Sequence, residues 1–132
     1  MAKDASLLLL DDETDILNGL ARYFGARGFR VECAAERGAA EALLRHDGYD
    51  CVILDLGLGA TPGNTEGLDL IPLVCALQPA ATVVVFTAYG SAALEAEARR
   101  RGARAFLLKP LPLAKLVAVV ERLIAGNSAA AR

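Results

Sequence analysis

The sequence predicts an α/β fold in which a parallel β-sheet is covered by helices on both faces. Short apolar segments alternate with longer segments whose apolar residues recur at helical spacing, and this alternation runs through the whole chain of 132 residues. The short segments lack the polar alternation of a half-exposed strand, which indicates that both faces of the sheet are buried. Parallel strands need crossover connections, and the intervening helices supply them.

The first two strand and helix units lie in the first third of the chain. Residues 7–10 are four leucines, which form a continuous apolar strand. Apolar residues then recur at helical spacing over residues 16–24, and Gly28 ends this pattern. A short strand over residues 30–33 and a helix over residues 39–44 complete the second unit.

The third unit is an apolar strand over residues 51–54, followed by a glycine-rich stretch and a helix over residues 68–77 with Pro72 near its start. The fourth unit consists of a strand over residues 83–86 and a helix over residues 91–101. The apolar face of this fourth helix is mostly alanine, so it should bury little and be the most mobile of the helices.

The fifth unit is a strand over residues 105–108 and a helix that Pro112 opens, with an apolar stripe along one side. With 55% hydrophobic residues, the chain is long enough to bury one core but too short for two. We therefore expect a single domain over residues 1–125, and we expect residues 126–132 to be a tail or the start of a linker.

Composition argues against several function classes. A net charge of −2 offers no general attraction to nucleic acid or to anionic lipid, so we expect neither direct nucleic-acid binding nor membrane binding. The apolar run near the N-terminus is too short for a signal peptide or a membrane span. Cys33, Cys51 and Cys75 lack Cys-x-x-Cys spacing and lie in or beside apolar segments, which predicts buried, reduced thiols and a cytoplasmic location.

Acidic side chains follow two of the expected strands, at the point where each strand ends. Asp11 and Asp12 come after the first strand, and Asp55 comes directly after the third. The carboxyl ends of parallel strands meet at one edge of a sheet, so these side chains should lie close together. Two carboxylates about 4 Å apart repel by roughly 4 kcal/mol at an effective dielectric constant of about 20, so the cluster is unfavourable unless a cation is shared.

Lys109 ends the fifth strand and is followed by Pro110. An acid pair, a single aspartate and a lysine at one sheet edge suggest a site for a divalent cation and a phosphoryl group. Each residue taken alone has a simpler interpretation: Asp11 or Asp12 could cap the following helix, and Lys109 could be a solvated lysine in a turn. Their joint placement favours the functional interpretation.

These residues carry a family resemblance. Asp11 and Asp12 after the first strand, Asp55 after the third, Thr87 after the fourth and Lys109 before a proline after the fifth resemble the receiver domain of bacterial two-component response regulators. The resemblance covers essentially the whole chain and implies a flavodoxin-like, doubly wound five-stranded sheet of order 2-1-3-4-5 with five helices. The segment Phe-Thr-Ala-Tyr-Gly-Ser is most similar to receivers of nitrogen-regulatory, enhancer-binding activators.

The resemblance also implies site roles. Asp55 would be the phosphoacceptor, taking a phosphoryl group from a sensor histidine kinase or a phosphotransfer protein. Asp12 would bind Mg²⁺, or alternatively Mn²⁺, directly, and Asp11 would bind it mostly through water. Asp55 and the backbone carbonyl of Gly57 would complete the metal ligands. Lys109 would pair with the phosphoryl oxygens.

A receiver is a switch rather than a turnover enzyme, with magnesium-dependent autophosphorylation and autodephosphorylation. The resemblance implies that the Thr87 hydroxyl swings toward the phosphorylated Asp55 and that Phe106, at the aromatic switch position, then turns inward. The Lys109-Pro110 peptide bond is expected to be cis. An output partner or a second copy would bind the face of the fourth helix, fifth strand and fifth helix.

Two other function classes stand beside this interpretation. A haloacid dehalogenase-type hydrolase also uses an aspartyl nucleophile, but it would have a second Asp where this chain has Glu13. A pseudo-receiver usually lacks one of the acids or the lysine. A phosphate-binding loop does not fit the glycine-rich stretch, because no Lys-Ser or Lys-Thr follows it. The loop of residues 56–66 is longer than in typical family members, which bears on access to Asp55.

Overall fold

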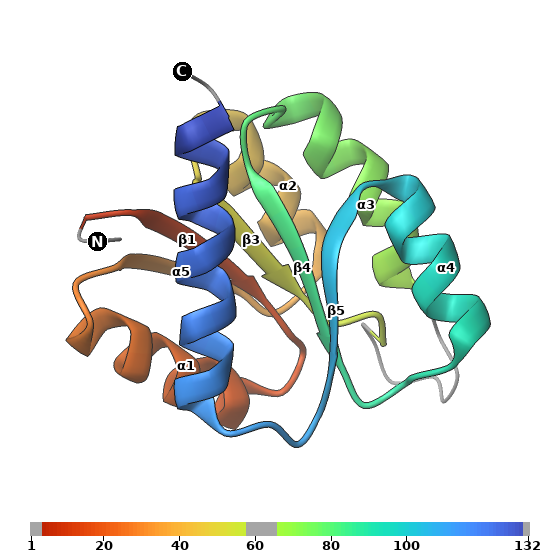
Figure 1. Cartoon of the computed structure of the whole chain (residues 1–132), viewed down its shortest axis with the longest axis horizontal. Coiled ribbons are helices and arrows are strands. Elements are labelled where there is room, and N and C mark those ends of the chain that lie inside the picture. Colours follow the sequence, from red (N-terminus) through yellow and green to blue (C-terminus); the bar gives the residue numbers. More distant parts are fainter. Residues whose placement is uncertain (1–3, 58–65, 131–132) are drawn as a thin grey trace.

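The computed structural model describes residues 4–57 and 66–130, in which strands and helices alternate along the chain (Figure 1). The strands are β1 (Ser6–Leu10), β2 (Arg30–Ala34), β3 (Cys51–Leu54), β4 (Thr82–Thr87) and β5 (Ala103–Leu108). The helices are α1 (Thr14–Ala26), α2 (Arg37–His46), α3 (Glu66–Leu77), α4 (Ala92–Arg101) and α5 (Leu113–Ala130). Most of the long loop of residues 56–66 lies outside the described residues.

All five strands are parallel and lie in the order β2-β1-β3-β4-β5, which confirms the predicted fold. The register between β1 and β3 places Leu10 opposite Leu54. The next residues, Asp11 and Asp55, therefore leave the sheet side by side, and the backbone N–H of Asp55 donates to the carbonyl of Leu10 at 3.0 Å. The fold thus creates the acidic edge that the sequence predicts.

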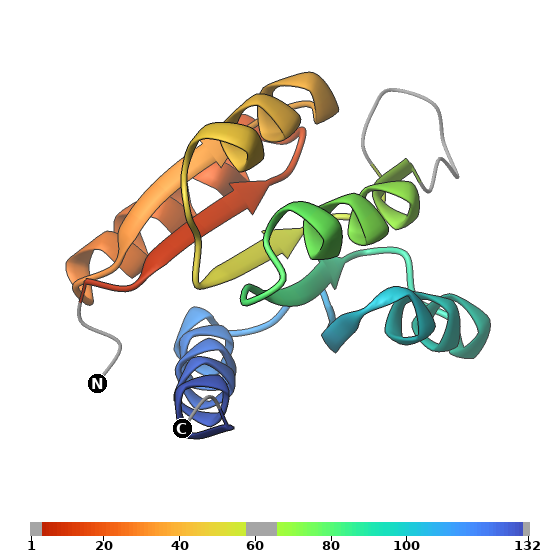
Figure 2. The same ribbon diagram turned by 90° about the horizontal axis from the view of Figure 1, so that it is seen from above.

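The sheet separates two apolar clusters. Leu7 and Leu9 of β1 pack with α1 and α5, whereas Leu8 and Leu10 pack with α2, α3 and α4. Seen from above, α3 and α5 lie on opposite sides of the strands (Figure 2). Every residue of β3 and β4 is buried, which explains why these strands are almost entirely apolar.

The exposure of the cysteines differs from the expectation. All three thiols are free, but Cys33 is exposed, while Cys51 is buried and Cys75 is half-buried. Cys33 lies in β2, which is an edge strand and buries only Ala34. The prediction of three buried thiols is therefore wrong for Cys33, because position in the sheet decides burial more strongly than the local apolar pattern.

Two helices differ from their expected extents. α3 begins at Glu66, so that Pro72 lies inside the helix rather than near its start. α5 continues to Ala130, beyond residue 125, where we expect the domain to end. That boundary remains a prediction. Within the two described ranges, each helix is too short or too polar to cross a lipid bilayer.

Candidate functional site

The carboxyl edge of the sheet brings together the side chains that end four of its strands. Asp11 follows β1, Asp55 follows β3, Thr87 is the last residue of β4 and Lys109 follows β5. The Nζ atom of Lys109 lies 3.0 Å from Oδ2 of Asp55 and 2.5 Å from Oδ2 of Asp11. These residues are far apart in the sequence, and the parallel topology alone makes them neighbours.

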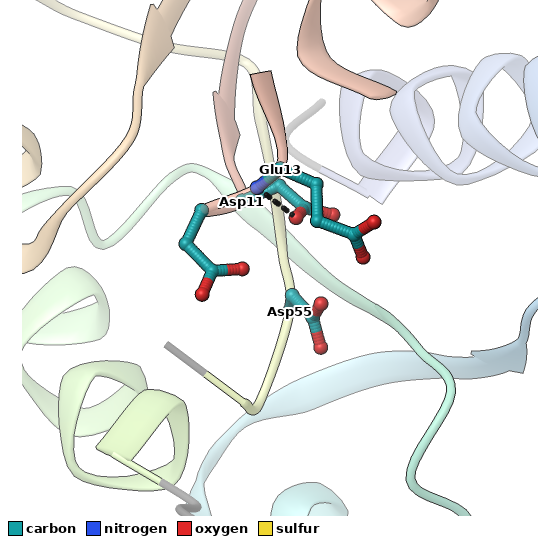
Figure 3. A group of neighbouring side chains, drawn as sticks. Asp11, Glu13 and Asp55 are labelled. Carbon is teal, nitrogen blue, oxygen red and sulfur yellow. Dashed lines mark hydrogen bonds between the residues drawn. The ribbon is translucent and has the colours of Figure 1, made fainter. Parts of the chain in front are cut away.

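Four carboxylates lie close together in the site. Asp11, Asp12, Glu13 and Asp55 each offer a carboxylate oxygen, and these oxygens lie within 4.8 Å of one another. Figure 3 shows Asp11 and Glu13 beside Asp55, with the backbone N–H of Glu13 donating to Oδ1 of Asp11 at 2.9 Å. Asp11 and Asp55 are buried, whereas Asp12 and Glu13 are exposed. One side of the cluster is therefore buried in the protein, and the other side is open to solvent.

This donor set fits a hard divalent cation. Carboxylate oxygens are the ligands that Mg²⁺ and Ca²⁺ prefer, and the chain offers four carboxylates to one nearby ammonium group, that of Lys109. The resulting excess of negative charge favours a bound cation. The acidic cluster is therefore able to hold a metal ion.

The buried charges shift each other's pKa values. Burial raises the pKa of Asp11, the negative charge of Asp55 adds to this, and the hydrogen bonds from Lys109 and from the Glu13 N–H oppose it. Burial alone would lower the pKa of Lys109, but its hydrogen bonds to Asp11 and Asp55 outweigh burial and leave that pKa raised. Lys109 is therefore a fixed positive charge at neutral pH, held between two carboxylates.

Both carboxylate oxygens of Asp55 accept hydrogen bonds. Oδ1 accepts a hydrogen bond from the Thr87 hydroxyl at 2.6 Å and one from the backbone N–H of Gly57 at 3.2 Å. Oδ2 accepts from Lys109. The hydroxyl oxygen of Thr87 in turn accepts from the backbone N–H of Tyr89 at 3.1 Å. The carboxylate that we expect to react is therefore fixed in orientation before any phosphoryl donor arrives.

The structure also places the predicted cis peptide and the predicted switch residues Thr87 and Phe106. The Lys109-Pro110 peptide bond is cis, the isomer expected from the sequence. Phe106 is half-buried and packs against the apolar cluster on the α4 side, which includes Ala98. The Thr87 hydroxyl donates to Asp55 before any phosphoryl group is present.

Sequence reasoning missed Glu13. This residue completes the acidic cluster and occupies the N-cap position of α1, where its side chain makes no capping hydrogen bond. A signal for it was available, because Glu13 directly extends the acid pair to three consecutive acids. The same geometry removes the simpler interpretation that Asp11 or Asp12 occupies the N-cap of α1.

Comparison with known proteins adds independent findings. A family model described as the response regulator receiver domain matches residues 7–121. The chain is 36% identical over 110 residues to the photosynthetic apparatus regulatory protein RegA of Rhodobacter capsulatus, covering 83% of this chain and 58% of that protein. It is 32% identical over 127 residues to the DNA-binding transcriptional regulator NtrC of Azospirillum brasilense, covering 94% of this chain and 25% of that protein.

A solved structure resembles the chain over nearly its full length. It is a response regulator protein from Burkholderia pseudomallei with a phosphorylated aspartic acid, a calcium ion and citrate. The TM-score is 0.83 at 32% identity, and the match covers 96% of this chain and 72% of that one. The relatives include NtrC-type enhancer-binding activators, as the segment of residues 86–91 indicates. The chain spans about half the length of the first curated relatives that it matches, 58% of one and 53% of the next.

Proposed function

The chain belongs to the response regulator receiver domain family, and from this premise we propose that it is a cytoplasmic switch phosphorylated on Asp55 by a partner histidine kinase or a phosphotransfer protein. The observation that carries this proposal is the environment of Asp55. Its buried carboxylate lies between Lys109, the Thr87 hydroxyl and a cluster of further carboxylates at the open edge of the sheet.

Asp55 has the surroundings that a phosphoacceptor needs. One of its carboxylate oxygens would attack phosphorus as the bond from phosphorus to the donor nitrogen breaks, which leaves an acyl phosphate on Asp55. The hydrogen bonds from Thr87 and Gly57 hold the carboxylate in one orientation, and this lowers the entropic cost of reaching the reactive geometry. Lys109 places a positive charge where the phosphoryl oxygens would gather.

We infer that the metal of this site is Mg²⁺, with Mn²⁺ as the alternative. Asp12 would bind it directly, Asp11 mostly through water, and Asp55 and the backbone carbonyl of Gly57 would complete the set. When bound, the ion would neutralise negative charge on the transferring phosphoryl group. Glu13 would add negative charge close to the ion.

Phosphorylation would change the acceptor of the Thr87 hydroxyl from the carboxylate to a phosphoryl oxygen. Phe106, half-buried against the α4 side, is placed to turn further inward when Thr87 shifts. The face formed by α4, β5 and α5 would then bind an output partner or a second copy. With autophosphorylation and autodephosphorylation both slow, the protein is a switch rather than a turnover enzyme.

Labelling with a small acyl phosphate in the presence of Mg²⁺ tests the acceptor. Intact-mass measurement should show one phosphoryl group on the wild-type chain and none on Asp55→Asn, because the amide is nearly isosteric but cannot attack phosphorus. Asp47→Asn is a matched control at an exposed aspartate outside the site and should label normally.

Each other outcome points to another function. Full labelling of Asp55→Asn would overturn the acceptor assignment. Continuous turnover of the acyl phosphate without labelled protein would indicate a hydrolase, and a wild-type chain that neither labels nor turns over would be a pseudo-receiver. Asp12→Asn should raise the Mg²⁺ concentration needed for half-maximal labelling rate, and an unchanged requirement would contradict its role as a metal ligand.

A further inference from the structure

Phe86, the residue before Thr87 in β4, combines a buried aromatic ring with a charged neighbour. The residue is only 5% exposed and belongs to the apolar cluster that α1 and α5 form with the sheet. The Nζ atom of Lys109 nevertheless lies over its ring, 5.6 Å from the ring centroid. A cation within about 6 Å of an aromatic centroid is attracted by the negative charge on the face of the ring.

The surroundings of this contact strengthen the attraction. The side chain of Lys109 is 12% exposed, so the ammonium group and the ring are both largely shielded from water. A cation and a ring attract each other more strongly when they are desolvated. Phe86 also borders a groove of about 300 Å³ between α1 and the start of α5, so one edge of the ring faces open space.

The other partners of the ammonium group are carboxylates. Lys109 pairs with Oδ2 of Asp11 and with Oδ2 of Asp55. Both carboxylates change their interactions in the proposed function, because Asp55 becomes an acyl phosphate and Asp11 turns toward the metal ion. The ring of Phe86 takes part in neither step. It is therefore a partner of Lys109 that phosphorylation leaves unchanged.

We propose that Phe86 is a positioning residue that keeps the ammonium group of Lys109 beside Asp55 while the two carboxylates change partners. This inference rests on the proposed function, since it assigns the phosphoryl oxygens to Lys109. A hydrogen bond requires alignment of donor and acceptor, whereas the face of a ring attracts a cation over a range of positions. The ammonium group can therefore turn from a carboxylate to a phosphoryl oxygen without leaving the ring.

The transfer step needs this charge in place. An oxygen of Asp55 forms a bond to phosphorus as the bond between phosphorus and the donor oxygen breaks, and the donor leaves with that electron pair. The negative charge on the phosphoryl oxygens is then stabilised best by a cation that does not have to move into position. Loss of the ring should consequently slow the transfer itself.

The experiment measures the rate at which the full chain is labelled. A small acyl phosphate is added over a range of concentrations with saturating Mg²⁺, and labelling is followed by intact mass. Phe86→Leu keeps an apolar side chain but removes the ring. Its maximal labelling rate should fall about tenfold, equivalent to ~1.4 kcal/mol in the barrier. An unchanged maximal rate would overturn the proposal.

Two further variants separate the charge on the ring face from packing. A trifluorinated phenylalanine at position 86 nearly keeps the shape of the ring but draws charge away from its face, so it should slow labelling in the same direction as Phe86→Leu. Phe86→Tyr keeps the face, and the groove beside the ring has space for the hydroxyl, so it should label at nearly the wild-type rate.

Phe24→Leu is a matched control in the same apolar cluster. The ring of Phe24 is fully buried and packs edge-on against Phe29 at 5.1 Å between centroids. This variant loses a buried ring of the same kind and should label at the wild-type rate. Slow labelling of Phe24→Leu to the extent seen for Phe86→Leu would mean that any loss of core packing disturbs the site, and the proposal would fail.

Proton NMR tests the contact without labelling. The ring current of Phe86 should displace the resonances of the CH₂ protons next to Nζ of Lys109, and Phe86→Leu should abolish this displacement. The displacement should persist in the wild-type chain when beryllofluoride and Mg²⁺ are added. Its loss would show that the ammonium group leaves the ring in the phosphorylated state, which contradicts the proposal.

The failures of the two proposals can be told apart. If the wild-type chain does not label, the proposed function fails, and the ring-current measurement still decides whether Lys109 stays on the ring. If Phe86→Leu labels at the wild-type rate, Asp55 remains the acceptor and only the role of Phe86 is overturned. If Phe86→Leu is slow but the trifluorinated variant is as fast as wild type, the ring acts by filling space, and the positioning role is again overturned.

Discussion

Helices α4 and α5 both border the proposed output face, but different forces hold them. α5 buries Leu116, Val117 and Val120 completely or nearly so against the sheet. α4 buries only Ala98. Leu94 is half-buried against the apolar cluster on the same side of the sheet. Ion pairs add to these contacts: Arg101 pairs with Asp69 of α3 at 3.1 Å, and the other pairs join arginine and glutamate side chains within α4 itself.

This difference shows which helix can act as the moving part of a switch. Burial of large apolar side chains is strong and fixes position, whereas exposed ion pairs contribute little and weaken in salt. We infer that α5 is the base of the output face and α4 is the element whose position can change. Moving α4 should therefore cost less free energy than moving α5.

The largest expected effect is on stability. Leu116→Ala removes a fully buried side chain from α5 and should lower the free energy of unfolding by about 2–5 kcal/mol. Leu94→Ala, the matched change at a half-buried position of α4, should cost about 1 kcal/mol. Urea unfolding measures both, and equal costs would mean that α4 is anchored as firmly as α5.

The next effect is structural and follows phosphorylation. Adding beryllofluoride and Mg²⁺, which mimic the phosphoryl group, should shift the amide resonances of α4 and β5 more than those of residues 116–120 in α5. This difference follows because α4 has little buried surface to hold it in place. Shifts confined to the connections around Asp55 would show that the switch runs by another route.

A third effect uses Cys75 as a reporter beneath the end of α4. Its Sγ donates to the carbonyl of Arg101 at 3.9 Å, and a Cβ on Gly102 would lie 2.5 Å from this sulfur. Burial raises the pKa of Cys75 and that of Cys51, so little thiolate forms near pH 8 and both should react slowly with a thiol reagent.

In a Cys33→Ser background, which removes the exposed thiol, beryllofluoride and Mg²⁺ should change the reaction rate of Cys75. Cys51 is buried in β3, between the two helix layers that cover the sheet, and it should stay unreactive, which makes it an internal control. An unchanged rate at Cys75 would indicate that the C-terminal end of α4 does not move.

The sequence predicts the fold well because each strand and helix carries its own local signal. Continuous apolar runs identify β1, β3 and β4, since a strand buried on both faces requires such a run. Cys33 shows where this reasoning stops. Ala34 follows it and Glu32 precedes it, and the exposure of β2 depends on its place at the edge of the sheet, which is set by topology.

Most of the candidate site could be predicted for a related reason, but the prediction was incomplete for a different one. Asp55, Lys109 and Thr87 each end a strand, and a parallel sheet aligns those ends. The backbone N–H of Tyr89 reaches the Thr87 hydroxyl from the connection after β4, and no periodicity in the sequence describes how such a connection folds. Glu13 lies between these cases, because its acidity is visible but its proximity to Asp55 depends on how the chain enters α1.

The smallest expected effect comes from the bridge between α4 and α3. Asp69→Asn removes the carboxylate that pairs with Arg101, while Arg101 keeps its contact with Glu97. Both partners are at least partly exposed, so global stability should hardly change, but hydrogen exchange of the α4 amides should quicken because the link to α3 is lost. Raising the salt to about 1 M, where the Debye length is about 3 Å, should bring the wild-type chain close to the variant. Exchange that is equally fast in both proteins at low salt would mean that apolar contacts, not the bridge, hold α4 in place. The two helices would then differ only in how much apolar surface they bury, not in the kind of interaction that holds them.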